Sequence, residues 1–175
     1  MICKLHVYTG NGKGKTTAAM GLALRSLGHG NTVLVAQFMK KGNSGELIAL
    51  QRFENALVLT APPIPGFTFQ MTDEEKQITR TRQTAFAAEA VQIIKKERPQ
   101  TVILDEMGMA LACGVLDESA ARELLDAALQ SAETAVTGRE VPNWLAERAD
   151  YLSRIQAERH PFAVQRLPAR KGVEW

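Results

Sequence analysis

The chain has 175 residues, of which 45% are hydrophobic and 23% are charged, proportions typical of one soluble globular domain. Its net charge of +2 gives no reason to expect a nucleic-acid partner, which would require a clustered basic face. No apolar run approaches the roughly 20 residues that span a bilayer, and the N-terminus lacks the features of a signal peptide. Cys3 and Cys113 form neither a CxxC pair nor a metal cluster, so we expect a cytoplasmic protein with reduced thiols.

The pattern of apolar residues predicts strands that alternate with helices along the chain. In chain order, the expected elements are a strand at residues 5–8, a helix at 15–27, a strand at 32–38, a short helix at 45–53, a strand at 56–60, a helix at 72–98, a strand at 101–104, a helix at 117–131, a strand at 135–137, a short helix at 142–148 and a strand at 151–155. Thr72, followed by three acidic residues, is typical of a helix N-cap. Prolines and a glycine exclude regular structure from the loop at residues 62–66, which leads to Phe67 and Phe69.

Strands that are separated by helices favour a parallel sheet with helices on both faces. The strands here are mostly continuous apolar runs, as strands buried on both faces should be. The sequence contains no internal repeat and no linker that would divide it. We therefore expect an α/β fold with a mostly parallel sheet and a single domain that spans residues 1–175.

The turn between the first strand and the first helix has the composition of a phosphate-binding loop. It reads Thr9-Gly10-Asn11-Gly12-Lys13-Gly14-Lys15-Thr16-Thr17. Its end matches the motif G-x-x-x-x-G-K-[ST], although Thr9 stands where the motif has its first glycine. Glycines let successive backbone N–H groups point into one concavity, and the helix that follows adds its positive dipole end. This loop predicts the binding of a nucleotide triphosphate, in a P-loop NTPase (RecA-like) architecture.

Individual side chains of the loop suit a bound ATP with Mg²⁺ or Mn²⁺. Lys13 and Lys15 would neutralise phosphate charge. Thr16 can offer its hydroxyl to the metal ion, and Thr17 can bond a phosphate oxygen. We expect the whole loop, from Thr9 to Thr17, to contact the nucleotide.

Two acids follow the strand at residues 101–104. Asp105 and Glu106 end a hydrophobic run, and an acid at this place in P-loop proteins holds Mg²⁺ directly or through water. Ligands in open parallel sheets bind at the carboxyl ends of the strands, so we expect Asp105 beside the phosphate loop. The sequence leaves open which of the two acids contacts the metal.

Two further residues are candidates for the same edge of the sheet. Arg139 follows the strand at 135–137 and should therefore face the ligand. His160 could be catalytic, but a single histidine more often has a structural role, and we expect that role here.

These pieces together resemble the P-loop ATP:corrinoid adenosyltransferases, which act on cob(I)alamin or cob(I)yrinic acid a,c-diamide. Thr9 in place of the first glycine is itself a feature of that family. The sequence differs from the usual family pattern at residues 107–109 and 151–155, and it begins directly at the first strand. The segments that carry the resemblance are residues 7–19, 21–25, 28–30, 35–40, 45–46, 66–69, 104–106, 110–111, 137–139, 142, 145, 149–150, 160–162 and 171–175.

The resemblance implies an unusual reaction for a P-loop protein. Co(I) of a reduced corrinoid attacks the ribose C5′ of ATP, the adenosyl group moves to cobalt, and inorganic triphosphate leaves. Because cobalt supplies the nucleophile, catalysis should rest on positioning and on charge stabilisation. The resemblance implies that Lys15, Thr16 and Glu106 carry this catalysis and that Thr16, Asp105 and Glu106 hold the metal.

The resemblance also implies roles for residues outside the loop. Phe67 and Phe69 would line the corrinoid face, where apolar side chains could displace the lower axial ligand of cobalt. Arg25 and Arg139 would join the loop in substrate binding. Implied partners are the corrinoid substrate, a flavoprotein reductant and a second copy of the chain in a homodimer, with neither nucleic acid nor membrane.

Two other functions remain open from the sequence. The first is a small P-loop kinase or NTPase that acts on another substrate. The second is a non-catalytic ATP-binding regulator that retains the loop and lacks a corrinoid site.

Overall fold

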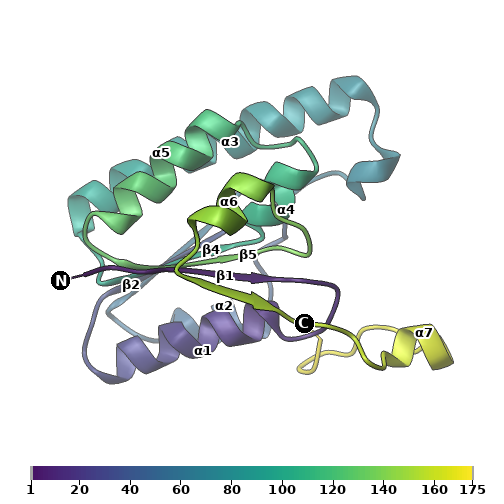
Figure 1. Ribbon diagram of the computed structural model, residues 1–175, viewed down its shortest axis with the longest axis horizontal. Helices are drawn as coiled ribbons and strands as arrows, with labels where there is room; N and C mark the ends of the chain where they lie inside the picture. Colours follow the sequence, from purple (N-terminus) through teal and green to yellow (C-terminus); the bar gives the residue numbers. More distant parts are fainter. Residues whose placement is uncertain (1, 175) are drawn as a thin grey trace.

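A computed structural model of the chain describes residues 2–174 (Figure 1). Its centre is one six-stranded sheet in which every neighbouring pair of strands is parallel. The strand order is β3-β2-β4-β5-β1-β6. The strands are β1 (Leu5–Thr9), β2 (Val33–Gln37), β3 (Ala56–Thr60), β4 (Thr101–Asp105), β5 (Glu133–Thr137) and β6 (Tyr151–Arg154).

Helices cover both faces of the sheet (Figure 1). One face carries α1 (Lys15–Gly28) and α2 (Gly45–Leu50). The other face carries α3 (Asp73–Glu97), α4 (Met107–Ala112), α5 (Glu118–Leu129) and α6 (Asn143–Arg148). A short α7 (Pro161–Gln165) lies beyond the carboxyl ends of the strands, together with the C-terminal segment. The α/β fold with a parallel sheet and helices on both faces, consistent with a P-loop NTPase, is thereby confirmed.

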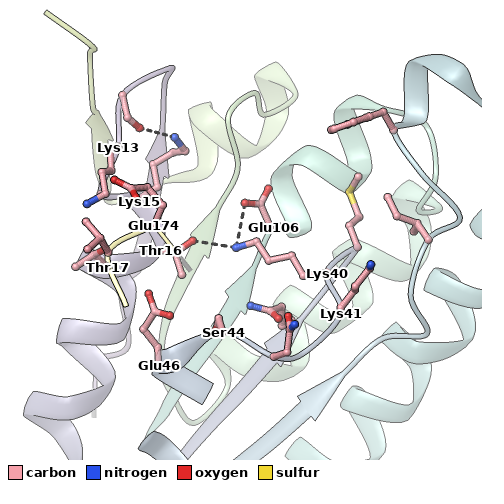
Figure 2. A pocket seen from close by; sticks show the side chains of 18 of the residues that line it. Lys13, Lys15, Thr16, Thr17, Lys40, Lys41, Ser44, Glu46, Glu106 and Glu174 are labelled. Atoms are coloured by element: carbon pink, nitrogen blue, oxygen red, sulfur yellow. Dashed lines mark hydrogen bonds and ion pairs between the residues drawn. The ribbon is translucent and has the colours of Figure 1, made fainter. Parts of the chain in front are cut away.

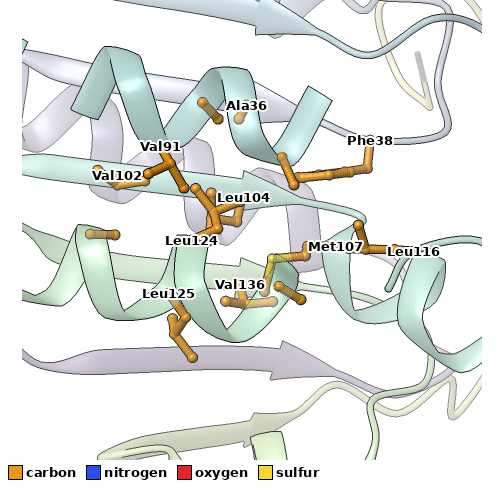
Figure 3. Packing of buried hydrophobic residues seen from close by; sticks show 14 of the residues in the cluster. Ala36, Phe38, Val91, Val102, Leu104, Met107, Leu116, Leu124, Leu125 and Val136 are labelled. Atoms are coloured by element: carbon orange, nitrogen blue, oxygen red, sulfur yellow. The ribbon is translucent and has the colours of Figure 1, made fainter. Parts of the chain in front are cut away.

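The core follows from continuous apolar strands between two helical layers. All five residues of β2 and all five of β4 are buried. On the α3–α5 side, Leu104 and Val136 of the sheet belong to one buried cluster with Leu124 and Met107 (Figure 3). Because both faces of β2 and β4 are covered, only apolar side chains and paired polar ones are tolerated along them. The polar side chains therefore collect where these strands end.

The helix at residues 73–97 begins as its sequence predicts. The Thr72 hydroxyl accepts from the Glu75 backbone N–H at 3.2 Å, and the Glu75 carboxylate accepts from the Thr72 N–H at 2.8 Å. This reciprocal pair is a capping box. The helix ends at Glu97, and the residue that follows, Arg98, takes a left-handed conformation with φ of 47° before Pro99.

Three short elements are present that the sequence pattern did not predict. Helix α4 starts directly after Glu106, whose φ of 61° turns the chain sharply out of β4. A 3-10 helix (Thr68–Gln70) lies between the proline-rich loop and α3. Helix α7 begins with a proline at its first position. Between residues 2 and 174, the structure has no helix that is both long and apolar enough to cross a membrane.

Candidate functional site

The phosphate loop connects β1 to α1 at the carboxyl edge of the sheet. Its last glycine, Gly14, has a φ of 120°, a conformation that side-chain-bearing residues rarely adopt. Gly14 is the N-cap of α1, and its carbonyl accepts from the Ala18 N–H at 2.8 Å. The first turn of α1 therefore directs its free N–H groups toward the loop, which is the geometry of an anion site.

The segment after β6 holds the loop from one side. The Gly12 N–H donates to the Ile155 carbonyl at 2.8 Å, and the Asn11 side-chain oxygen accepts from the Ala157 N–H at 3.1 Å. A Cβ atom on Gly10 would lie 2.4 Å from the Ile155 carbonyl oxygen. A Cβ atom on Gly12 would lie 2.7 Å from the carbonyl carbon of Gln156. Both glycines are therefore required for close backbone packing, and Gly10, with a φ of 105°, is required for the turn as well.

Thr9 anchors the loop from the other side. Its buried hydroxyl donates to the Arg139 carbonyl at 3.2 Å, and the Gly10 N–H donates to the same oxygen at 3.1 Å. The residue that replaces the first glycine of the motif thus binds the segment after β5. Thr9 is predicted to contact the nucleotide as part of the loop, and its hydroxyl is directed at the protein backbone.

Asp105 is the most completely buried acid at this edge, with no exposed surface. Thr16 and Thr137 donate hydroxyls to its Oδ1 at 2.8 and 2.7 Å. Gln37 and Lys40 donate to its Oδ2, both at 2.9 Å. Burial by itself raises the pKa of Asp105, but the charge of Lys40 and the hydrogen bonds outweigh it and hold the pKa below its ordinary value. The carboxylate is therefore ionised and fixed beside the loop, as predicted.

Lys40 is the cation that faces both acids. Its Nζ lies 2.9 Å from Asp105 Oδ2 and 3.3 Å from Glu106 Oε1. Figure 2 shows the contact with Glu106. Burial lowers the pKa of Lys40, but the charges of Asp105 and Glu106 more than compensate, and the pKa is raised. A three-residue turn at Phe38, Met39 and Lys40, with a Met39 φ of 60°, brings this side chain back over the end of β2.

Lys15, the lysine of the loop motif, folds back on its own loop. Its Nζ donates to the Gly12 carbonyl at 2.7 Å. Burial lowers its pKa, and the nearby Arg139 and Lys40 lower it further against the opposing charge of Glu106. An anion in the loop would relieve this repulsion, because it would bring negative charge into a cluster of cations.

A cleft of about 580 Å³ opens over the loop (Figure 2). Its wall includes residues 12–17, both Gln37 and Lys40, and the acid Glu106. Phe67 reaches the same cleft from the loop before α3. Phe67 and Phe69 are 67% and 79% exposed, and their rings stack with centroids 5.4 Å apart. The two aromatics thus form an apolar surface at the rim of a polar cleft.

A second hollow of about 890 Å³ shares Lys13, Lys15 and Glu106 with the first cleft. Arg139 and His160 line it, so Arg139 reaches the ligand edge as expected. The His160 ring accepts from the Phe162 N–H at 3.2 Å and caps α7, which is the structural role that the sequence favoured.

Arg25 does not join the site. It lies in the last turn of α1, ten residues after Lys15, and a helix rises about 1.5 Å per residue. The expected contact between Arg25 and the nucleotide within one chain therefore has no support in this geometry, and neither cleft includes Arg25 among its lining residues.

Three residues of the site were missed as functional residues: Gln37, Lys40 and Thr137. Gln37 and Thr137 are polar residues at the carboxyl ends of buried strands, as Asp105 is, so the same rule could have found them. Lys40 follows its strand by three residues, and only the turn at Met39 brings it to the acids.

The oxygen atoms at this edge fit a magnesium ion. Thr16, Asp105 and Glu106 supply a hydroxyl and two carboxylates, and the buried Oε1 of Gln37 has no hydrogen-bond partner in the described part of the chain. Residues 2–174 contain no group of three or more acids, histidines or cysteines that would hold a metal unaided. Mg²⁺ commonly binds to one or two carboxylates and takes its other ligands from phosphates and water.

Comparison with known proteins places the chain in a family. Residues 3–175 match the family model described as ATP:corrinoid adenosyltransferase BtuR/CobO/CobP. The chain belongs to this adenosyltransferase family. A corrinoid adenosyltransferase of Pseudomonas aeruginosa is 32% identical over 98% of this chain and 83% of its own length. One from Escherichia coli K12 is 31% identical over 97% of this chain and 84% of its own length.

Proposed function

We propose that the protein transfers the adenosyl group of ATP to the cobalt of a reduced corrinoid. In this step the electron pair of Co(I) forms a bond to the ribose C5′ of ATP. The bond between C5′ and its phosphate oxygen breaks, and triphosphate leaves with the electron pair of that broken bond. Membership of the family supports this reaction, and the site must then hold a triphosphate while leaving C5′ open to attack.

One observation carries the proposal: the phosphate loop and an exposed aromatic surface meet in a single cleft. Residues 12–17 and Phe67 line the same cavity. A polyanion in the loop and a flat, largely apolar macrocycle on Phe67 and Phe69 would therefore lie side by side. A kinase for a small polar acceptor would gain nothing from two exposed phenylalanine rings at this position.

The residues of the cleft suit stabilisation of a leaving triphosphate. Lys13 and Lys15 face the cavity from the loop, and Thr17 adds a hydroxyl. Catalysis would come from donors and charges that are in place before the reaction, because the corrinoid brings its own nucleophile. A magnesium ion held by Thr16, Asp105 and Glu106 would supply further positive charge to the departing phosphates.

The reaction requires a supply of Co(I). Formation of Co(I) requires a one-electron donor of low potential, and we propose a flavoprotein reductant in the cytoplasm.

We also propose a homodimer. The edge strand β6 leaves Tyr151 and Leu152 exposed, and light scattering would measure the oligomeric state.

The test is an assay with ATP, Mg²⁺ and chemically reduced cob(I)alamin. The cobalt–carbon bond is followed by its absorption spectrum, and the phosphate products are separated by ion exchange. Adenosylcobalamin and triphosphate in equal amounts are expected. Release of ADP and phosphate instead would identify a kinase or NTPase, and ATP binding without turnover would identify a regulator; either result would overturn the proposal.

A further inference from the structure

Lys40 occupies the place where a metal ion would bind. Its ammonium contacts three oxygen atoms: Asp105 Oδ2 at 2.9 Å, Glu106 Oε1 at 3.3 Å and Thr16 Oγ1 at 3.3 Å. Figure 2 shows the last two of these contacts. They come from the same three residues that the proposed function assigns to the magnesium ion.

A cation at this position is required for the folded protein. Asp105 has no exposed surface, and a buried carboxylate without a compensating positive charge is strongly unfavourable. Among the described residues, Lys40 alone forms an ion pair with Asp105. The neighbouring Lys41 also lines the cleft, but it is exposed and forms no ion pair with either acid in the described part of the chain.

Two cations cannot share this position. An ammonium and a divalent ion within contact distance of the same carboxylate oxygens would repel each other strongly in a partly desolvated cleft. Binding of the metal therefore requires Lys40 to leave. The Lys40 side chain is 36% exposed and lines the same cleft as residues 12–17, so a triphosphate in the loop offers it a new partner.

We infer that Lys40 is an internal substitute for the metal ion, which excludes divalent cations from the free protein and moves to the triphosphate when the nucleotide arrives. The inference rests on the proposed function for the identity of the site. It makes metal binding dependent on nucleotide, and it adds a third lysine to the charges that stabilise the leaving group. It is specific to Lys40, since Lys15 is held by the Gly12 carbonyl and not by the acids.

The test measures metal binding in the absence of nucleotide. Mn²⁺ is titrated into the full-length protein and followed by electron paramagnetic resonance. Wild type should bind free Mn²⁺ weakly and should bind it much more tightly once ATP is present. Lys40→Met should bind free Mn²⁺ at least about 10-fold more tightly than wild type, because the competing charge is gone. Lys41→Met, which removes an adjacent lysine without altering the acids, should match wild type.

A second variant covers the case in which Lys40→Met fails to fold. Lys40→Gln retains a hydrogen-bond donor for Asp105 but removes the charge. Its Tm should fall in metal-free buffer and rise by several degrees with Mn²⁺ alone, whereas the Tm of wild type should hardly respond. A lysine with only a structural role would give the fall in Tm without the recovery.

The outcomes separate this inference from the proposed function. Equal affinity for free Mn²⁺ in wild type and Lys40→Gln would overturn the inference, even if wild type produces adenosylcobalamin. Wild type that binds free Mn²⁺ as tightly without ATP as with it would also overturn it. Nucleotide-dependent Mn²⁺ binding without adenosylcobalamin would leave the inference intact and refute the proposed function.

Discussion

The Thr137 hydroxyl donates to Oδ1 of Asp105 at 2.7 Å and joins the end of β5 to the end of β4. The Thr137 hydroxyl oxygen in turn accepts from the Glu106 backbone N–H at 2.9 Å. The Thr137 side chain therefore orients the Asp105 carboxylate and also fixes the sharp turn at Glu106.

Replacement of Thr137 by valine should destabilise the protein. The substitution keeps the shape but removes one of four side-chain donors to the buried Asp105 carboxylate and leaves the Glu106 N–H without its hydroxyl acceptor, which costs about 1–3 kcal/mol. Urea unfolding measures the change. Thr137→Ser keeps the hydroxyl and should lie much closer to wild type. If Thr137→Val and Thr137→Ser lowered the free energy of unfolding equally, loss of the hydrogen bonds would not be the cause of the destabilisation.

Removal of the Lys15 charge should weaken ATP binding with little effect on the fold. Among the described residues, Lys15 Nζ donates only to the Gly12 carbonyl of its own loop, at 2.7 Å, and the charges of Arg139 and Lys40 lower its pKa. Hydrogen bonds to charged groups contribute about 1.5–3 kcal/mol, so Lys15→Ala should lower the affinity for ATP by roughly 10- to 100-fold. Calorimetric titration gives the affinity, and thermal melting checks the fold. Lys96→Ala, which removes an exposed lysine of α3 outside both clefts, serves as the control; a comparable loss there would indicate a general charge effect.

Loss of the exposed aromatic pair should affect the corrinoid and spare the nucleotide. Phe67 and Phe69 project from the rim of the cleft, and both rings are mostly exposed. We expect Phe67→Ala to lower the rate of adenosylation at least about 10-fold, since a buried aromatic contact contributes several kcal/mol. The affinity for ATP should stay within about twofold, as only the apolar surface is lost. Phe53→Ala, another exposed phenylalanine, is the matched control. Unchanged turnover in Phe67→Ala would remove the proposed corrinoid role.

The sequence predicts the parts of the site that depend on local patterns. The phosphate loop is one continuous segment, and Asp105 ends an apolar strand, so both can be located without three-dimensional information. Lys40 could not be placed in this way. Its position depends on a left-handed turn at Met39, and nothing in the residue type of methionine signals that conformation.

Contacts between segments that are far apart in the chain also could not be predicted from the sequence pattern. Asn11 and Gly12 pack against residues 155–157, almost the full length of the chain away. Such a contact is set by the order of the strands, which places β6 next to β1. Arg25 is a different case, because family resemblance named the residue, whereas the structure places it in the last turn of α1, ten residues after Lys15.

Two glycine substitutions should have opposite effects on stability. Gly10 has a φ of 105°, and its added Cβ would lie 2.4 Å from the Ile155 oxygen, so Gly10→Ala should cost at least about 2 kcal/mol. Gly21 lies on α1 with nothing within 4 Å of an added Cβ, so Gly21→Ala should stabilise by about 0.5–1 kcal/mol. Urea unfolding of both variants provides the comparison. A stable Gly10→Ala protein would mean that the segment after β6 yields readily.

The ion pair at the start of β1 should make stability depend on pH in the acidic range. The Asp150 carboxylate accepts from Lys4 Nζ at 2.7 Å and from the Leu5 N–H at 2.9 Å, and these two bonds lower its pKa. A carboxylate whose pKa is lower in the folded state stabilises the fold above its unfolded pKa, and this stabilisation is lost as the pH falls through the folded pKa. Asp150→Asn should therefore be less stable than wild type at neutral pH. The difference in free energy of unfolding should shrink toward zero well below the usual titration range of aspartate. Urea unfolding at several pH values measures it, and a difference that is independent of pH would show that the charge of Asp150 has no part in it.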